Sequence, residues 1–342
     1  MLMKERIKDK QPSVAIIIVN YNGAEDTIEC VKSLNKINYD NYKIFVIENG
    51  SSKKPTKEQI DYLKGQTVYI ESAENLGFSG GNNIGIRKAI ENEFDYVLLL
   101  NNDTTVEPDF LSILIDAATK KNNVGIVGGK IAFYSKPSHL WYGGGHMDEK
   151  FGGGAHERWN DLNPEDTGEI REVTFITGCL MLIPTEVVKK VGLLSEEYFL
   201  YAEDTDFCYK VLEAGYKLWF CENTLIYHKV SASTGATSAM TQYYMVRNVL
   251  YLTKKYRTDY HKVNARFTYQ TMKDVIRGRK QFAPVRCAYR DYLKGNMGKF
   301  SSIPPEDEND FADYLVLHGA VLREETNCKW LKDCIKLCKK GV

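Results

Sequence analysis

Long apolar runs are missing from this chain of 342 residues. No stretch approaches the roughly 18 uninterrupted apolar residues that a membrane-spanning helix requires. The amino terminus MLMKERIKDK is charged where a signal peptide would carry an apolar core. Proline (9 residues) and glycine (26 residues) are present in ordinary numbers, which excludes collagen-like and low-complexity classes. The sequence therefore predicts a soluble cytoplasmic protein.

An excess of charge of either sign is also absent, because 45 Lys and Arg residues balance 45 Asp and Glu residues. Overall neutrality argues against a general nucleic-acid coat protein, and we expect no nucleic-acid partner. The charges are nevertheless unevenly spread, since residues 254–300 hold thirteen Lys and Arg but only three Asp. This basic stretch carries ten net positive charges, and the rest of the chain carries ten negative ones.

Paired metal-binding cysteines are lacking too. Eight cysteines occur, but none forms a CxxC pair and no histidine completes a zinc set. Four of them stand singly within apolar runs, where a thiol usually behaves as a small core residue. This pattern is typical of a reduced compartment.

The first half of the chain alternates apolar runs with helical patterns. Residues 14–19 form a continuous apolar run, which is typical of a strand buried on both faces of a parallel sheet. Similar runs follow at 42–48, 67–71 and 96–100, with helical patterns between them. This order predicts an α/β fold with a doubly wound, mostly parallel, Rossmann-like sheet.

Later segments differ in character. Residues 141–154 are rich in glycine without a clear period, and two short strands are expected at 218–221 and 225–228. From residue 241 on, helical patterns dominate. We therefore predict a tail at 1–12, a sheet domain at 13–240 and a helical region at 241–342. The helical region contains the basic stretch and an amphipathic tail at 327–340.

Polar side chains collect where the predicted strands end. These side chains are Asn20 and Asn22, Glu48, Asn75 to Asn83, and Asn101 to Asp103. Turn formation explains any one such cluster, but ligands of open α/β sheets bind beyond the carboxyl ends of the strands. All four clusters together favour a site for a polar ligand. The glycine-rich residues 77–85 match neither a Walker loop nor a dinucleotide fingerprint.

Acidic residues and a histidine suggest further chemistry. Asp103 could hold Mg²⁺ or Mn²⁺ together with His228, although a helix cap and a core histidine are the structural alternatives. Glu203, Asp204 and Asp206 lie at a predicted helix start, where the helix dipole alone favours carboxylates. Closely spaced carboxylates also raise one another's pKa values, which suits a general base.

In order and spacing these stretches resemble the family-2 glycosyltransferases with the GT-A fold, especially their rhamnosyltransferase-like branch. The resemblance covers roughly residues 13–256. It rests on VAIIIVNYNG, VIENGS, ENLGFSGGNNIGI, YVLLLNNDT, FITGCLMLIPTEVVKKVG, FLYAEDTDFCYKVLEAGYKL, IYHKVSAS and YYMVRN.

The resemblance implies inverting transfer of a sugar from a nucleoside-diphosphate donor to a hydroxyl. The donor it favours is dTDP-rhamnose, with a UDP-hexose as the alternative, and the acceptor is a cell-surface glycan or a lipid-linked sugar. It assigns the catalytic base to Asp204, with Glu203 and Asp206 as support and acceptor contacts. Asp103 and His228 would bind Mg²⁺ or Mn²⁺, and Arg247 would meet the leaving diphosphate.

The same resemblance assigns the nucleotide-sugar pocket. Its members would be Asn20, Asn22, Glu48, Asn75, Gly77, Gly80, Gly81, Asn82, Asn83, Asn101 and Asn102. Two of these depart from the family pattern, since Glu48 and Asn101 stand where aspartate is usual.

Other interpretations remain open. A nucleotidyltransferase would need a basic glycine-rich loop directly after the first strand, and no Lys or Arg occurs there before Lys32. A non-catalytic sugar-nucleotide-binding protein would not need the base, the metal ligands and the diphosphate contact together. The basic stretch is either a solvated helical face or a contact with anionic lipid at the inner face of the plasma membrane. A homodimer through the C-terminal helices is a further hypothesis.

Overall fold

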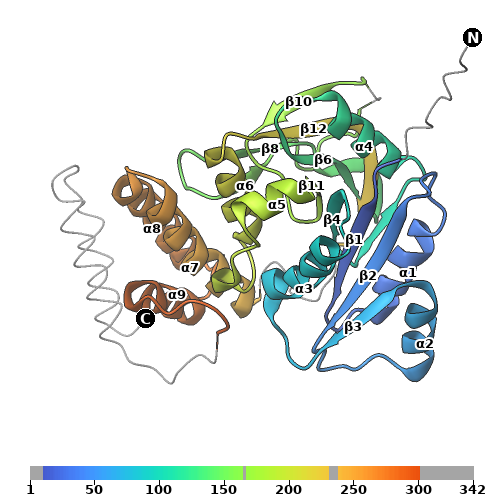
Figure 1. Ribbon diagram of the computed structural model, residues 1–342. Coiled ribbons are helices and arrows are strands. Elements are labelled where there is room, and N and C mark those ends of the chain that lie inside the picture. The colour runs from blue at the N-terminus through green and yellow to red at the C-terminus, as the bar shows by residue number, and fades with distance from the viewer. Residues whose placement is uncertain (1–10, 165–166, 231–237, 301–342) are drawn as a thin grey trace, which may run out of the picture. The chain divides into compact units, whose positions relative to one another are not determined.

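A computed structural model describes residues 11–164, 167–230 and 238–300 (Figure 1), so the predicted amphipathic tail at 327–340 lies outside the described residues. The chain divides into two compact units. The described residues of unit 1 fall within 11–146, 155–195 and 204–230, and those of unit 2 within 147–154, 196–203 and 238–300. Two short segments that precede residue 240 therefore belong to the helical unit.

Unit 1 is built on a ten-stranded sheet. Eight of its strands follow the order β10-β12-β6-β11-β4-β1-β2-β3, and the other two, β5 and β7, pair with β12 and β6, respectively. The strands of this sheet are β1 (Val14–Asn20), β2 (Tyr42–Asn49), β3 (Val68–Ser72), β4 (Tyr96–Leu100), β5 (Thr104–Val106), β6 (Val124–Phe133), β7 (Lys136–Tyr142), β10 (Ile170–Val173), β11 (Leu180–Pro184) and β12 (Lys217–His228). Strands β4, β1, β2 and β3 run parallel. The predicted α/β fold with a mostly parallel central sheet is confirmed.

Antiparallel strands extend this parallel half. Strand β11 runs antiparallel to both β4 and β6, and β10 runs antiparallel to β12. Strand β12 pairs in parallel with β6 and antiparallel with β5. The last residue of β12, His228, thereby lies opposite Thr104 of β5.

Helices cover both faces of the sheet. They are α1 (Ala24–Leu34), α2 (Lys57–Gln66), α3 (Gly77–Glu91), α4 (Phe110–Lys120), α5 (Thr185–Val191) and α6 (Glu203–Glu213). The crossovers β1-α1-β2 and β3-α3-β4 step along the sheet in opposite directions, so right-handed connections place α1 and α3 on opposite faces. Helix α3 packs closely on β1, since a Cβ at Gly85 would lie 2.6 Å from the side chain of Ile17.

Two predicted segments differ from the structure. Residues 217–228 form one strand rather than two, with a register irregularity between Cys221 and Leu225. The polar residues at this irregularity interrupt the apolar pattern but not the strand. The segment 141–154, predicted to be irregular, holds the end of β7 and all of β8 (Gly145–Met147), which pairs with β9 (Gly154–His156).

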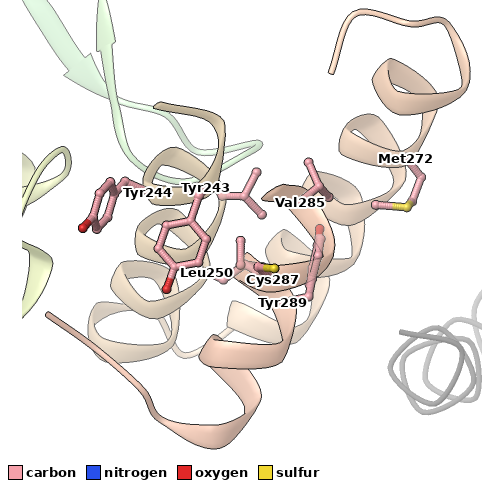
Figure 2. Close-up of a cluster of buried hydrophobic side chains, with 9 residues drawn as sticks. Tyr243, Tyr244, Leu250, Met272, Val285, Cys287 and Tyr289 are labelled. Carbon is pink, nitrogen blue, oxygen red and sulfur yellow. The ribbon is translucent and has the colours of Figure 1, made fainter. Parts of the chain in front are cut away.

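Unit 2 is helical, with α7 (Ala239–Tyr256), α8 (Tyr260–Ile276) and α9 (Phe282–Lys294), preceded by the short 3₁₀ turn Glu196–Tyr198. Its own hydrophobic core gathers side chains from all three helices, among them Leu250, Met272 and Tyr289 (Figure 2). Across the described ranges, none of the helices combines the length and the apolar character needed to cross a membrane.

Candidate functional site

The carboxyl ends of β1 and β2 are tied together by polar side chains. Asn20 and Glu48 lie opposite each other in the strand register, and the Asn20 side-chain amide donates a hydrogen bond to the Glu48 carboxylate. The other Glu48 oxygen accepts from the Ser51 backbone N–H at 2.8 Å. Both side chains are buried, so the sheet edge predicted to carry the donor nucleotide is rigidly hydrogen-bonded.

The loop after β1 forms the exposed part of this edge. Asn22 takes a left-handed backbone conformation (φ 59°), and its N–H donates to the Ser51 hydroxyl at 2.8 Å. Its side-chain oxygen accepts from the Lys53 backbone N–H at 2.8 Å. The two loops after β1 and β2 are therefore joined into one polar rim.

The glycine-rich segment divides into a rim part and a buried part. The Asn75 side-chain oxygen accepts from the Gly77 N–H at 2.8 Å and fixes the start of α3. The remaining predicted members (Gly80, Gly81, Asn82 and Asn83) are buried in α3. The Asn83 side chain exchanges hydrogen bonds with the backbone of Leu194 at 3.0 and 3.1 Å. These buried members pack α3 against the rest of unit 1.

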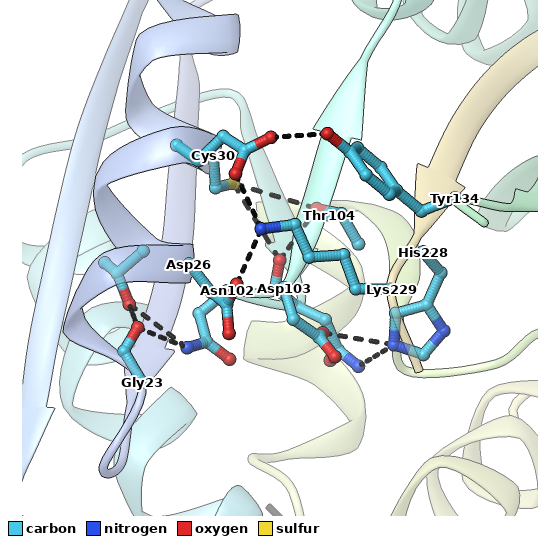
Figure 3. Close-up of polar contacts among 12 residues, drawn as sticks. Gly23, Asp26, Cys30, Asn102, Asp103, Thr104, Tyr134, His228 and Lys229 are labelled. Atoms are coloured by element: carbon cyan, nitrogen blue, oxygen red, sulfur yellow. Dashed lines mark hydrogen bonds and ion pairs between the residues drawn. The ribbon is translucent and has the colours of Figure 1, made fainter. Parts of the chain in front are cut away.

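Asp103 and His228 come together at the ends of β4 and β12 (Figure 3). The Asp103 Oδ1 atom lies 3.1 Å from His228 Nε2, and both side chains are largely buried. The Asn101 side-chain nitrogen lies 3.5 Å from the same ring nitrogen. Asn102 points the other way, because its amide donates to Gly23 O at 3.3 Å and to the Thr27 hydroxyl at 3.1 Å.

This pair has the chemistry of a divalent-cation site. Burial by itself would lower the pKa of His228, but the neighbouring Cys179 and the hydrogen-bonded Asp103 raise it to about 10, so a cation bound here would have to displace the imidazolium proton. Buried His228 Nδ1 has no hydrogen-bond partner among the described residues. One carboxylate and one imidazole suit Mg²⁺ or Mn²⁺ when ligand oxygens complete the coordination. The described ranges hold no cluster of three or more His, Cys, Asp or Glu side chains that could bind a metal unaided.

A lysine that sequence patterns did not single out supports this pair. Lys229 follows His228 directly, and its ammonium lies 2.6 Å from Asp26 and 2.6 Å from Glu29, both on α1 (Figure 3). The Tyr134 hydroxyl donates to the other Glu29 oxygen at 2.9 Å. The sequence signal for this contact is a charged residue that directly follows the strand ending in His228.

Asp204 lies at the start of α6 with its carboxylate held from several directions. One oxygen accepts from the Gly178 N–H at 3.0 Å, and the other accepts from the Thr205 N–H at 2.7 Å. Burial raises the pKa of Asp204, while these hydrogen bonds oppose the shift. A carboxylate of raised pKa in a fixed orientation is suited to take up a proton.

The two acidic neighbours of Asp204 have different settings. Asp206 is fully buried, accepts from the Ser195 hydroxyl at 2.6 Å and lies 3.3 Å from the Lys210 ammonium. These contacts anchor α6 within unit 1. Glu203 is buried as well and is the first residue of α6.

Arg247 lies inside unit 2. Its guanidinium donates to Gly298 O at 2.8 Å and to Tyr198 O at 3.1 Å, and it borders a cavity of about 520 Å³ within this unit. The adjacent Asn248 amide donates to Leu200 O and Tyr201 O, both at 2.8 Å. These contacts give the Arg-Asn pair a structural role around the segment that precedes α6, a role that the sequence did not reveal.

A mostly parallel central sheet with a polar carboxyl edge and an aspartate-histidine pair is the arrangement in which open α/β proteins bind ligands beyond the strand ends. The family model "Glycosyl transferase family 2" matches residues 15–192, which is more than half of the chain. The chain belongs to this family. A second family model, "Virulence activator alpha C-term", matches residues 258–339.

Curated relatives include glycan-building proteins. The chain is 27% identical over 214 residues to the low-salt glycan biosynthesis hexosyltransferase Agl10 of Haloferax volcanii, covering 61% of this chain and 64% of the relative. It is 27% identical over 134 residues to poly-beta-1,6-N-acetyl-D-glucosamine synthase of Staphylococcus aureus, covering 39% of this chain and 32% of the relative. The chain thus spans less than two thirds of the length of either relative.

Solved structures share the fold. GalNAc-T7 with UDP, GalNAc and Mn²⁺ superposes with a TM-score of 0.60 at 18% identity, covering 87% of this chain and 60% of that one. The mannosyltransferase PcManGT from Pyrobaculum calidifontis, in complex with GDP-Man and Mn²⁺, gives a TM-score of 0.52 at 13% identity, with coverages of 97% and 85%. These likenesses confirm the GT-A fold.

Proposed function

We propose that this protein transfers a sugar from a nucleoside-diphosphate donor to an acceptor hydroxyl with inversion at the anomeric carbon. The observation that carries the proposal is the buried contact between Asp103 and His228 at the end of the parallel strands. Family membership and the nucleotide-sugar and Mn²⁺ ligands named for the two structural neighbours support it.

The donor would lie along the rim formed by the loops after β1 and β2. Asn22 and Asn75 present polar groups there, and Glu48 with Asn20 fixes the strand ends beneath them. We favour dTDP-rhamnose as the donor and keep a UDP-hexose as the alternative. Asp103 and His228 would hold Mg²⁺ or Mn²⁺, which when bound neutralises charge on the leaving diphosphate.

Asp204 would act as the general base. Its hydrogen bonds to the Gly178 and Thr205 N–H groups hold the carboxylate in one orientation. As the acceptor oxygen attacks the anomeric carbon, its proton passes to Asp204 and the bond to the diphosphate breaks. One displacement suffices, so no covalent sugar–enzyme intermediate is required. Glu203 and Asp206 would support the start of α6, and Arg247 is assigned no part in this step.

The acceptor would be a cell-surface glycan or a lipid-linked sugar. The basic stretch at 254–300 suits peripheral contact of a cytoplasmic enzyme with anionic lipid, and pairing of two copies through the same helices is the competing hypothesis. Flotation with anionic liposomes at low and high salt tests the first hypothesis, and sedimentation tests the second. Absence of liposome binding at low salt would end the lipid hypothesis.

A screen of sugar nucleotides with Mn²⁺ or Mg²⁺ tests the proposed function. We expect slow hydrolysis of one donor to free sugar and nucleoside diphosphate, dependent on the metal. Binding of a donor without any turnover would instead favour a non-catalytic sugar-nucleotide-binding protein. Release of pyrophosphate from a nucleoside triphosphate would favour a nucleotidyltransferase.

A further inference from the structure

An exposed tryptophan is linked to His228 of the aspartate-histidine pair through one intervening ring, that of Trp141. Trp159 is 52% exposed, although large apolar side chains usually seek burial. Its ring packs against Phe133 with a centroid separation of 5.3 Å and against Trp141 at 6.0 Å. Phe133, Trp141 and Trp159 together form what we call the aromatic platform.

The backbone around Trp159 is held in an unfavourable conformation. Arg158 and Asn160, its two neighbours, both have left-handed backbones with φ of 57° and 62°. Such conformations persist only where surrounding contacts enforce them, and they concentrate at ligand-binding sites. Here the Arg158 guanidinium pairs with the buried Glu222 at 2.9 Å, and the Asn160 N–H donates to Leu140 O at 2.8 Å. The fold therefore holds Arg158 in a strained conformation and presents the Trp159 indole ring to solvent.

Direct ring contacts connect the aromatic platform to the candidate metal pair. The Trp141 ring contacts the His228 ring edge to face, with a centroid separation of 4.5 Å and an interplanar angle of 82°. His156 also contacts the Trp141 ring edge to face, with a centroid separation of 4.5 Å. Ring contacts therefore connect the exposed Trp159, through Trp141, to His228.

We propose that the aromatic platform binds a pyranose ring of the saccharide acceptor. A pyranose has an apolar face of C–H groups, and an exposed indole offers the flat apolar surface that such a face covers well. The hydroxyls at the ring edge stay in water or reach polar groups. The role of this sugar as an acceptor rests on the proposed function, whereas the binding of the sugar does not.

Saturation-transfer NMR with simple sugars tests the platform directly. The probes are the methyl glycosides of glucose, galactose, mannose and N-acetylglucosamine, added at millimolar concentration to the full chain. We expect saturation of the ring C–H protons of at least one glycoside by the wild-type protein. The variant W159A should weaken binding about tenfold, whereas W159F should retain most of it. Tyr269, 45% exposed on α8, supplies the matched control Y269A, which should bind like wild type.

Separate readouts distinguish this proposal from the proposed function. Thermal shift with UDP or dTDP and Mn²⁺ follows the donor site, and W159A should leave that shift unchanged. Sugar binding that depends on Trp159 without any nucleotide shift would uphold the platform and overturn the donor site. Equal saturation by wild type and W159A, or no saturation by wild type with any of the four glycosides, would overturn the platform.

Discussion

Asp103 Oδ1 and His228 Nε2 lie 3.1 Å apart, although one residue follows β4 and the other ends β12. The pairing of β5 with β12 brings them together, since Thr104, next to Asp103, lies opposite His228. A carboxylate and an imidazole that meet only through tertiary structure can provide two ligands for one cation.

Removing either partner of this pair should abolish metal-dependent chemistry. For D103N and H228A we expect donor hydrolysis to fall roughly a thousandfold, because a bound cation contributes several kcal/mol to stabilising the leaving group. Steady-state hydrolysis over a Mn²⁺ titration measures this loss. K120A, which breaks an exposed ion pair with Asp116 on α4, is the control, and a loss as large as that of D103N would show that the effect is not specific to the proposed metal ligands.

Asp204→Asn should remove the base while leaving the donor in place. We expect transfer to fall by about 10²- to 10⁴-fold, the usual contribution of general-base catalysis, with little change in donor affinity. Single-turnover transfer and donor titration measure the two effects separately. Full transfer activity in this variant would contradict the base assignment.

The same substitution should change how the stability of the fold depends on pH. Burial raises the folded-state pKa of Asp204, so between the unfolded-state and folded-state pKa values the folded state binds more protons than the unfolded state. The free energy of unfolding therefore falls as pH rises through this range. Asparagine carries no such charge. Asparagine also has one acceptor oxygen where the carboxylate has two, so the variant loses one of the hydrogen bonds from the Gly178 and Thr205 N–H groups at every pH. We therefore expect the Tm of Asp204→Asn, relative to that of wild type, to be higher at pH 7 than in acid below the unfolded pKa. The same Tm difference at both pH values would contradict the burial effect.

Lys229→Ala should lower the affinity of the site for Mn²⁺, although Lys229 is not itself a proposed metal ligand. The Lys229 ammonium ties the end of β12 to Asp26 and Glu29 of α1, and the loss of such supporting contacts typically costs about 10- to 100-fold in metal affinity. The Mn²⁺ dependence of donor hydrolysis measures this shift. Lys229→Arg should restore most of the affinity, and K120A, which breaks an exposed pair with Asp116, is the control.

Asn248→Ala should loosen the segment that leads into α6. Tyr201 and Ala202 have left-handed backbones, and the buried Asn248 amide donates to Leu200 O and Tyr201 O. Leaving those carbonyls without their donor should destabilise the protein by about 1–3 kcal/mol. Urea unfolding measures this value, and a change below the error of that measurement would contradict it. M245A, at an exposed position on the same helix, is the control.

Sequence patterns predicted those parts of the fold and of the site that follow a regular pattern along the chain. Apolar runs between helices predicted the parallel strands, and polar strand ends predicted the edge where Asn20 and Glu48 meet. The setting of Arg247 could not be predicted, because two of its hydrogen-bond partners are the backbone carbonyls of Gly298 and Tyr198, which no side-chain pattern reveals. The exposure of Trp159 could not be predicted either, because it depends on a non-repetitive loop held by the ion pair between Arg158 and Glu222 of β12.

Calorimetric titration of the nucleoside diphosphates UDP and dTDP in the presence of Mn²⁺ tests most directly whether Asp103 and His228 form a nucleotide-linked metal site. We predict that one of the two binds to the wild-type protein only when Mn²⁺ is present, and that D103N abolishes this binding while K120A, at an exposed pair on α4, retains it. Equal affinity in Mn²⁺ and in EDTA, or unchanged metal-dependent binding by D103N, would contradict the assignment.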